Sequence, residues 1–213
     1  MFVGDRMSRP VITVTPDMAI HDVLAMFKQE HIRRAPVIKN GKLVGIVSET
    51  DLLNASPSDV TSLSIWEMNY LLSKITVKIV MTKMVITIDE DTPIEEAARI
   101  MADNKIGGLP VLKKGRVTGI ITETDLFKIF LEIMGSRQKA TRVTAIVEDK
   151  HGALSNVTKA IAAHGGNFIS FGMFSGPDAN TKEVTFKVEG ITQDEIKKAL
   201  KDIVVKFQDI RVS

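Results

Sequence analysis

Two short segments of the sequence combine hydroxyl groups with a carboxylate where a strand is expected to run into a helix. They are Gly45–Asp51 (Gly-Ile-Val-Ser-Glu-Thr-Asp) and Gly119–Asp125 (Gly-Ile-Ile-Thr-Glu-Thr-Asp). Hydroxyls at a helix N-terminus can cap its free N–H groups or hold a phosphate, because the helix dipole favours an anion. A carboxylate there repels phosphate but accepts two hydrogen bonds from a vicinal diol such as ribose. These groups together suit a nucleoside, and ordinary helix capping is the alternative interpretation.

The two segments close the copies of an internal repeat. Residues 7–52 return 74 positions later without an insertion or deletion, so that Met7 corresponds to Met81 and Pro36-Val37 to Pro110-Val111. A period of this length, present only twice, indicates two matched modules and not an open solenoid. Two such modules can cover each other's apolar faces about a pseudo-two-fold axis, and the arrangement would present the site twice.

Each copy has the pattern strand, helix, strand, strand, helix. In the first copy, Val11–Val14 is expected to be a strand, and apolar residues at helical spacing follow from Ile20 to Phe27. In the second copy, Thr92–Glu95 predicts a capping box with proline in the first helical turn. Asn40-Gly41 predicts a hairpin between two short apolar strands, and Lys114-Gly115 predicts its counterpart.

The segment between the copies predicts a further helix. Ser64–Glu67 has the sequence of a capping box, and the helix that it opens is expected to run to about Leu72. Trp66 and Tyr70 would share one face of this helix. They are expected to dock the helix on its neighbours, and a stack for a ligand is the alternative.

The pattern changes beyond Ala140. Helices are expected after Gly152 and from the capping box Thr192–Glu195. The expected strands are Val143–Val147, Asn167–Phe174, Lys182–Val188 and a final strand within Val205–Val212. The order βαββαβ is the ferredoxin-like pattern. The sequence therefore predicts an α/β (α+β) protein with a first module at residues 1–76 that includes the linker helix, a second module at 77–136 and a third domain at 137–213.

The composition limits the class of protein. The chain has 213 residues, of which 44% are apolar and 25% charged, as in an ordinary globular protein. A net charge of +2 gives no bulk argument for nucleic acid or an anionic membrane as a partner. No apolar run reaches the roughly 18–20 residues that a membrane helix needs, and charged residues such as Asp5 interrupt any signal peptide. We expect a cytoplasmic location.

Metal and thiol chemistry are not expected. The sequence has no cysteine, so it offers neither disulfides nor thiolate ligands. The four histidines show no metal-ligand spacing with carboxylates or with each other.

The repeat resembles the CBS domain, and the two copies together resemble a CBS pair, or Bateman module. The resemblance covers Met7–Leu53 and Met81–Phe130 and rests on the Met-Ser/Thr start, the helix stripe, the Pro-Val strand and the Gly-x-x-Ser/Thr-x-Thr-Asp ending. The C-terminal part is similar to an ACT domain, through Asp149–Leu154 and Gly165–Ile169. The whole chain resembles the AcuB-type CBS–ACT proteins of acetoin utilisation.

The resemblance implies that an adenine nucleotide (AMP, ADP or ATP) binds in two clefts between the repeats. Asp51 and Asp125 would bind the ribose hydroxyls. The residues expected to line the ribose and phosphate are Ser48, Thr50, Thr122 and Thr124. The residues expected to hold the adenine are Ile12, Thr13, Ala35, Pro36, Ile86, Thr87, Leu109 and Pro110.

The two copies differ just before the Pro-Val strand. The first has Arg33-Arg34, and the second has Gly107-Gly108. Arginine suits phosphate through bidentate hydrogen bonds, and solvated surface charge is the alternative. One cleft is therefore expected to bind a phosphorylated ligand well, and the other to bind it poorly or to take only a nucleoside such as S-adenosylmethionine.

The resemblance to an ACT domain implies a second kind of site. The residues for an amino acid or a similar small metabolite would be Asp149, His151, Gly152, Ala153, Leu154 and Asn167. Exposed backbone N–H groups would receive the carboxylate of the ligand, and Gly152 would permit close approach. The alternative is that this domain only dimerises, edge to edge.

These observations predict a regulatory, ligand-sensing protein and not an enzyme. An adenine nucleotide would be its regulatory ligand, with no cofactor, and the partners would be a second copy of the chain and a regulated metabolic enzyme, with a link to acetoin metabolism. One alternative is a sensor of S-adenosylmethionine or adenosine, and another is a structural interaction module. An enzyme acting on a nucleotide or amino acid is disfavoured, because the chain lacks a Walker loop, a Gly-rich dinucleotide fingerprint and a nucleophile elbow.

Overall fold

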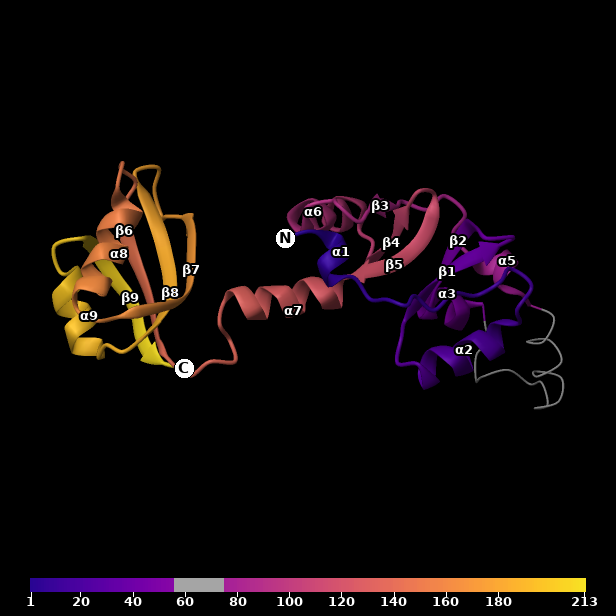
Figure 1. Ribbon diagram of the computed structural model, residues 1–213, viewed down its shortest axis with the longest axis horizontal. Coiled ribbons are helices and arrows are strands. Elements are labelled where there is room, and N and C mark those ends of the chain that lie inside the picture. The colour runs from indigo at the N-terminus through magenta and orange to yellow at the C-terminus, as the bar shows by residue number, and fades with distance from the viewer. Residues whose placement is uncertain (56–74) are drawn as a thin grey trace. The chain divides into compact units, whose positions relative to one another are not determined.

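The structure, a computed structural model, describes residues 1–55 and 75–213. The helix expected from Ser64 to Leu72, with Trp66 and Tyr70, lies outside the described residues. The chain divides into two compact units, Met1–Leu126 and Phe127–Ser213 (Figure 1). The boundary between the units falls inside a helix, ahead of the predicted boundary at 136, and the three-domain division of the sequence stays a prediction.

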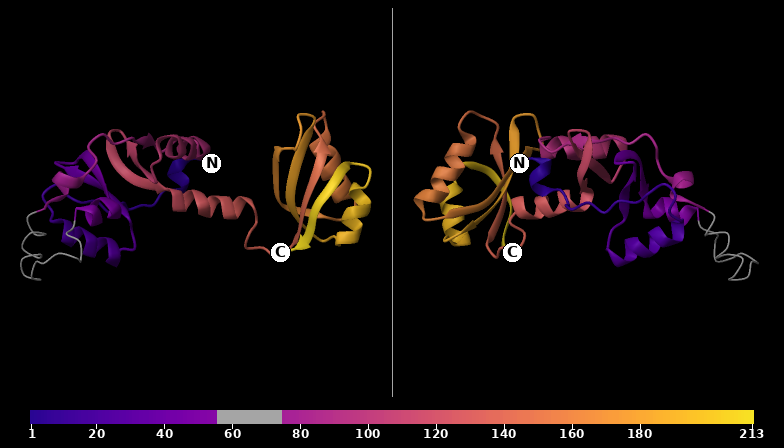
Figure 2. Two further views of the ribbon diagram at one scale, coloured as in Figure 1. Left: turned by 180° about the vertical axis from the view of Figure 1, so that it is seen from behind. Right: turned by 45° about the vertical axis from the view of Figure 1, so that its right-hand side comes forward.

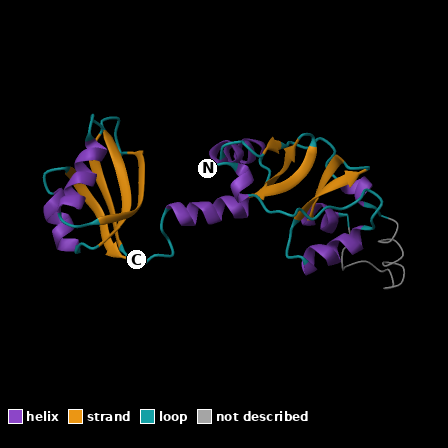
Figure 3. Ribbon diagram, in the orientation of Figure 1, coloured by secondary structure: helices purple, strands orange, loops and turns teal. Residues whose placement is uncertain are grey.

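The first unit contains both repeats, each with an antiparallel hairpin and flanking helices (Figure 3). Its elements are α1 (Val3–Arg6), α2 (Ile20–Gln29), β1 (Arg34–Lys39), β2 (Lys42–Ser48), α3 (Glu49–Asn54), α5 (Val77–Val80), β3 (Ile88–Asp89), α6 (Ile94–Asn104), β4 (Gly108–Lys113), β5 (Arg116–Thr122) and the start of α7 (Glu123–Ile133). Both predicted hairpins are confirmed, and Asn40 and Lys114 adopt the positive φ that their tight turns require.

The segments that begin the two repeats are exchanged. Val3 of α1 lies in the buried core of the second repeat, and Val77 of α5 lies in that of the first. Backbone hydrogen bonds fix the exchange: the Val3 N–H donates to the Thr92 carbonyl at 2.9 Å, and the Val77 N–H donates to the Met18 carbonyl at 3.0 Å. Each repeat therefore completes its core with the segment that starts the other.

The exchange explains two predictions that are wrong. The capping box at Thr92–Glu95 is absent: Pro93 precedes the helix as N-cap, no side chain caps α6, and the Ile94 N–H donates instead to the Met1 carbonyl at 3.2 Å. The strand expected at Val11–Val14 is reduced to one parallel bridge between Val14 and Val37. The residues ahead of Val14 are directed elsewhere, since Ser8 pairs with Ile120 of the other repeat.

The second unit has the predicted βαββαβ order. Its elements after α7 are β6 (Thr141–Glu148), α8 (Ala153–Ala163), β7 (Asn167–Ser175), β8 (Thr181–Glu189), α9 (Gln193–Leu200) and β9 (Val204–Val212). The strands form one antiparallel sheet in the order β7-β8-β6-β9, as the ferredoxin-like pattern requires. Both helices lie on one face of this sheet in every view (Figure 2). The capping box at Thr192 is confirmed, since its hydroxyl accepts a hydrogen bond from the Glu195 N–H at 3.3 Å.

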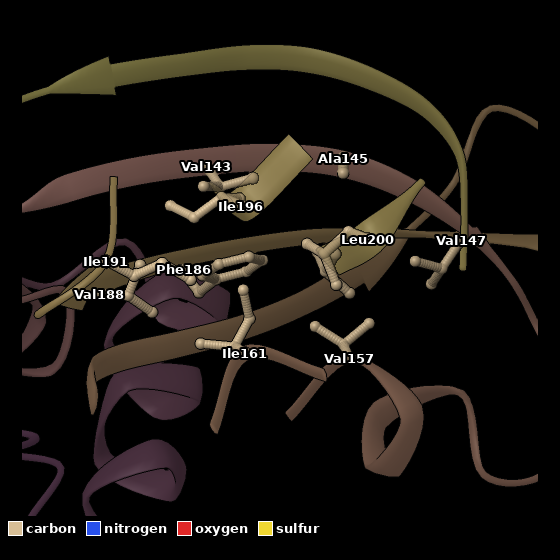
Figure 4. Packing of buried hydrophobic residues seen from close by; sticks show 11 residues of the cluster. Val143, Ala145, Val147, Val157, Ile161, Phe186, Val188, Ile191, Ile196 and Leu200 are labelled. Carbon is tan, nitrogen blue, oxygen red and sulfur yellow. The ribbon is translucent and has the colours of Figure 1, made fainter. Parts of the chain in front are cut away.

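The core of the second unit lies between this sheet and its two helices (Figure 4). Alternate residues of β8, among them Phe186 and Val188, point toward Ile161 of α8 and Leu200 of α9, and all four are fully buried. The alternate apolar residues of the strand thus pack against the apolar faces of the two helices.

Lys187 ties the chain that follows α7 to the sheet. Its side chain is only 6% exposed, and its ammonium group donates to the carbonyl oxygens of Gly135, Gln138 and Ser213 at 3.2, 3.1 and 3.3 Å. These oxygens satisfy the three donors of the ammonium. The buried cation therefore links β8 to the chain after α7 and to the end of β9 through hydrogen bonds.

Replacing this ammonium should destabilise the second unit. Lys187→Met keeps the length of the side chain but removes three charge-assisted hydrogen bonds, so we expect a loss of about 1.5–3 kcal/mol in the free energy of unfolding. Urea unfolding of the full chain measures it. Lys159→Met, at an exposed position of α8, is the matched control and should change stability by less than about 0.5 kcal/mol. Equal effects of the two substitutions would show that Lys187 contributes nothing specific.

Candidate functional site

The first strand–helix junction is a capping box. Ser48 is the N-cap of α3, and its hydroxyl oxygen accepts a hydrogen bond from the Asp51 N–H at 3.2 Å. In return, Oδ2 of Asp51 accepts hydrogen bonds from the N–H and the hydroxyl of Ser48, at 2.8 and 2.6 Å. The capping interpretation of this segment is therefore confirmed.

The second junction repeats this geometry at the start of α7. Oδ2 of Asp125 accepts hydrogen bonds from the N–H and the hydroxyl of Thr122, at 3.0 and 2.7 Å. Capping and ligand binding do not exclude each other, because the cap uses one carboxylate oxygen. At Asp51 the other oxygen, Oδ1, forms no hydrogen bond with any residue that the structure describes.

A cavity of about 440 Å³ lies at the first junction. This volume is within the range of small-molecule sites, about 300–1,000 Å³. Its lining residues come from both repeats and are Arg33, Arg34, Ile46, Ser48, Glu49, Thr50, Asp51, Thr82, Met84, Val85, Ile86, Lys105, Ile106, Gly107 and Gly108. The exchanged segment builds this cavity: Thr82 and Ile46 form two backbone hydrogen bonds of 2.9 Å, so the chain from Thr82 to Ile86 runs beside the end of β2.

The cavity brings together six of the predicted site residues. These are Arg33, Arg34, Ser48, Thr50, Asp51 and Ile86. It also contains residues that the sequence did not single out, chiefly Glu49, Thr82, Met84, Val85, Lys105 and Ile106. The internal repeat was the signal that could have found Lys105 and Ile106, since they correspond to His31 and Ile32, the residues before the arginines.

Several predicted adenine contacts lie elsewhere. Ala35 and Leu109 are fully buried in the cores of the two repeats, and Pro36 and Pro110 are buried beside them. Thr13 lines a different cavity of about 630 Å³ between the two hairpin turns. Ile12 and Thr87 are half-buried and line neither cavity.

The second junction is less accessible than the first. Asp125 is only 8% exposed, whereas Asp51 is half-buried on the cavity wall. Nη2 of Arg33 donates to the hydroxyl oxygen of Thr124 at 3.3 Å. Arg33 therefore belongs to the lining of the first cavity and also contacts the second junction.

Arg34 explains why the second copy has glycines. A Cβ atom added at Gly107 would collide with the guanidinium of Arg34 and lie 2.8 Å from a carboxylate oxygen of Glu123. A Cβ at Gly108 would lie 2.7 Å from Nη1 of Arg34. Burial lowers the pKa of the Arg34 guanidinium, while the Glu123 carboxylate opposes this shift and Arg33 adds to it. Arg34 thus fills the space that a side chain in the second copy would need.

The predicted small-metabolite residues of the second unit do not converge within one chain. Gly152 adopts φ +83° as N-cap of α8, a conformation that favours glycine, and Asp149 forms an ion pair with Lys182 at 3.3 Å. Asn167 lies at the opposite end of the sheet, where its amide donates to Glu189 at 3.0 Å.

The space beside this loop is small. The cavity next to it has about 50 Å³ and is lined by Val147, Glu148, Lys150, Ala153, Asn156, Asp202 and Ile203. That volume holds water but not an amino acid. The two other residues predicted for this site, His151 and Leu154, are exposed.

Neither a metal cluster nor a membrane helix is found in the described part of the chain. No group of three or more His, Cys, Asp or Glu residues among residues 1–55 and 75–213 could hold a metal ion. No helix within these ranges is long and apolar enough to cross a membrane.

The fold and the site define a tandem-repeat module in which the cavity at the first junction draws on both copies. The sequence signature of the CBS domain matches residues 3–58 and 76–132, more than half of the chain. The chain belongs to the CBS domain family. An uncharacterized protein of Methanocaldococcus jannaschii, MJ1225, is 34% identical over 136 residues, which are 60% of this chain and 46% of that protein. The chain thus spans about half the length of this relative.

Solved structures share the fold of the repeats. The CBS domain pair of protein MJ0100, in complex with 5′-methylthioadenosine and S-adenosyl-L-methionine, has a TM-score of 0.52 and 30% identity over 65% of this chain and 98% of its own. A Vibrio cholerae structure, described as that of a putative acetoin utilization protein (AcuB), has a TM-score of 0.53 and 30% identity. The match covers 64% of this chain and 95% of the Vibrio cholerae chain. CBSX2 in complex with AMP has a TM-score of 0.50 and 30% identity, and the match covers 62% of this chain and 97% of the CBSX2 chain.

The steric relation between Arg34 and Gly107 can be tested by a double-mutant cycle. Gly107→Ala should reduce the free energy of unfolding by about 0.5–1 kcal/mol, because the new methyl group displaces the ends of the Arg34 and Glu123 side chains. In an Arg34→Ala background the same substitution should cost clearly less, and urea unfolding of the four proteins gives the coupling. If Gly107→Ala lowers the free energy of unfolding equally in both backgrounds, Arg34 is not what prevents a side chain at position 107.

Proposed function

We propose that this chain is a regulatory sensor that binds an adenine nucleotide (AMP, ADP or ATP) at the Asp51 cleft. The observation that carries the proposal is the cavity at the first junction, where a carboxylate held by its capping box shares one site with two arginines. The ligands of the similar structures support it, since CBSX2 is in complex with AMP and the MJ0100 pair with two adenine nucleosides.

Each part of the ligand has a chemically suited part of the cavity. Oδ1 of Asp51 would accept hydrogen bonds from the ribose hydroxyls, since Oδ2 is used by the cap. The exposed Arg33 would bind phosphate, and the half-buried Arg34 would add positive potential. The apolar side chains of Ile86 and Ile106 would contact the adenine. The nucleotide is in this proposal a regulatory ligand, neither cofactor nor substrate, and the chain acts without catalysis.

A second candidate ligand suits the second cleft. S-adenosylmethionine or adenosine carries a ribose but no phosphate, and the Asp125 junction repeats the capping geometry of the first. Its lower exposure favours a ligand without phosphate. The complex of the MJ0100 domain pair with S-adenosyl-L-methionine supports this candidate.

We propose that residues 137–213, which make up most of the second unit, are an ACT domain that serves dimerisation or the sensing of a small metabolite. Its βαββαβ topology and the exposed edges of β7 and β9 support pairing with a second copy. Phe127, Phe130 and Ile133 of α7 are more than half exposed, at 68%, 55% and 52%, as apolar residues at an interface would be in a single chain. The likeness to the AcuB structure motivates a metabolic enzyme, in acetoin metabolism, as the regulated partner.

Nucleotide binding can be measured by calorimetric titration of the full chain with AMP, ADP, ATP and S-adenosylmethionine. We expect micromolar affinity and no turnover. Asp51→Ala and Asp125→Ala should each weaken binding in one cleft by about one to two decades, or ~1.5–3 kcal/mol, because each removes a charge-assisted contact to ribose.

The control for this titration is Asp17→Ala, at an exposed position outside the cavity. Thermal unfolding of each variant separates lost capping from lost contact, and Asp51→Asn keeps an acceptor for the cap while it removes the charge. Dissociation constants that stay at the wild-type value in both Asp51→Ala and Asp125→Ala would remove the ribose assignment.

We expect a homodimer at tens of micromolar in sedimentation equilibrium. Phe130→Glu should shift the protein toward monomer, because it places a charge in an apolar contact. Lys159→Glu, on the exposed side of α8, is the control and should leave the mass unchanged. A wild-type protein that sediments as a monomer would contradict the proposed dimer.

A further inference from the structure

One exposed side chain, that of Arg33, reaches both strand–helix junctions. It lines the cavity beside Asp51, and its Nη2 donates to the hydroxyl oxygen of Thr124 at 3.3 Å. The first contact belongs to the site of the first repeat, and the second contact belongs to that of the second repeat. A single guanidinium therefore contacts the cavity at the first junction and a residue of the second junction.

Arg33 and Arg34 differ in how firmly they are held. Arg34 is half-buried beside Glu123 and fits against Gly107 and Gly108, so it has little freedom to reorient. Arg33 is exposed, and within the described part of the chain its guanidinium donates only to a neutral hydroxyl, that of Thr124. Of the two arginines, Arg33 is the one that a ligand can move.

A phosphate competes well for this guanidinium. Hydrogen bonds between a guanidinium and an anionic oxygen are about twice as strong as those between neutral groups, and they can be bidentate. The contact to the Thr124 hydroxyl is a single bond near the long end of the hydrogen-bonding range. An anionic group in the Asp51 cleft thus offers Arg33 a stronger partner than Thr124 does.

We propose that Arg33 couples the two clefts. A phosphate bound beside Asp51 draws Arg33 away from Thr124, and the second junction then opens to a ligand of its own. This inference rests on the proposed function, since it requires a ligand with phosphate in the first cleft and a ribose-bearing ligand in the second. Binding in the second cleft must favour phosphate binding in the first by the same factor, because coupling between equilibrium sites is reciprocal.

The most direct test measures the affinity of the Asp51 cleft for ADP while a residue of the second junction, Thr124, is substituted. In an Asp125→Ala background, which confines binding to the Asp51 cleft, Thr124→Val removes the competing acceptor. ADP should then bind about two- to fivefold more tightly, as expected for one hydrogen bond that no longer has to be broken. Thr124 does not line the Asp51 cavity, so a local role of this residue predicts no change.

Two controls isolate the mechanism. Thr124→Ser retains the hydroxyl and should retain the affinity of its background for ADP. Adenosine carries no phosphate to attract Arg33, so Thr124→Val should leave the affinity of the first cleft for adenosine unchanged. Thr124 is exposed, and thermal unfolding of each variant shows whether α7 keeps its stability.

Arg33→Ala should change the two clefts in opposite directions. In the Asp125→Ala background it should weaken ADP binding about three- to tenfold, because a phosphate contact is lost. In an Asp51→Ala background it should strengthen adenosine binding at the second junction about two- to fivefold, because Thr124 is released.

The outcomes separate the inference from the proposed function. Saturable ADP binding in the Asp125→Ala protein that Thr124→Val does not alter overturns the coupling and leaves the sensor intact. The coupling is also overturned if Arg33→Ala changes the affinities for ADP and for adenosine in the same direction. If neither ADP nor adenosine binds saturably to the wild-type chain, the proposed function fails, and the coupling fails with it.

Discussion

The structure depends on the exchange of the segments that begin the two repeats. Neither repeat closes its own core: Met7, at the start of the first, packs its thioether on Gly119 of the second, and Met81 packs on Gly45 in the same way. A Cβ at Gly45 would lie 2.6 Å from the sulfur of Met81, so the methionine and the glycine of the repeat require each other. Because the exchanged segment continues along the end of the neighbouring strand, the cavity at the first junction is built from both copies.

The duplicated sequence does not make the two strand–helix junctions alike, and the reason for the difference is steric. Positions 33–34 and 107–108 approach each other between the two copies, as the contact of Arg34 with Gly107 and Gly108 shows. Two arginines facing each other there would overlap and repel, whereas one arginine fits if its counterpart has no side chain. The Glu123 carboxylate then compensates part of the desolvation of Arg34. Packing thus accounts for the difference between the two copies, and it leaves Arg33 as the more exposed of the two arginines.

The sequence was most informative where structure is determined by neighbours along the chain. The hairpin at Asn40, the cap at Ser48 and the βαββαβ order of the second unit follow from turn chemistry, capping residues and periodicity. The predictions at Thr92–Glu95 and Val11–Val14 failed because of contacts with distant segments: the Ile94 N–H donates to the Met1 carbonyl, and Ser8, just ahead of Val11, pairs with Ile120. Among the site residues, the junctions were evident from their repetition, but the reach of Arg33 to Thr124, 91 positions away, was not.

The capping box and the candidate ligand site share one side chain, that of Asp51. A carboxylate that binds a ribose from a free side chain loses rotamer freedom on binding, and this loss reduces affinity by about 0.5–1.5 kcal/mol for each ordered side chain. In this protein Ser48 already holds Asp51 through Oδ2, so its orientation is fixed before any ligand arrives. The same hydrogen bonds begin α3, and their counterparts at Thr122 begin α7. If the proposed function holds, a ligand on either carboxylate would contact the first turn of a helix, and one of these helices, α7, continues into the second unit.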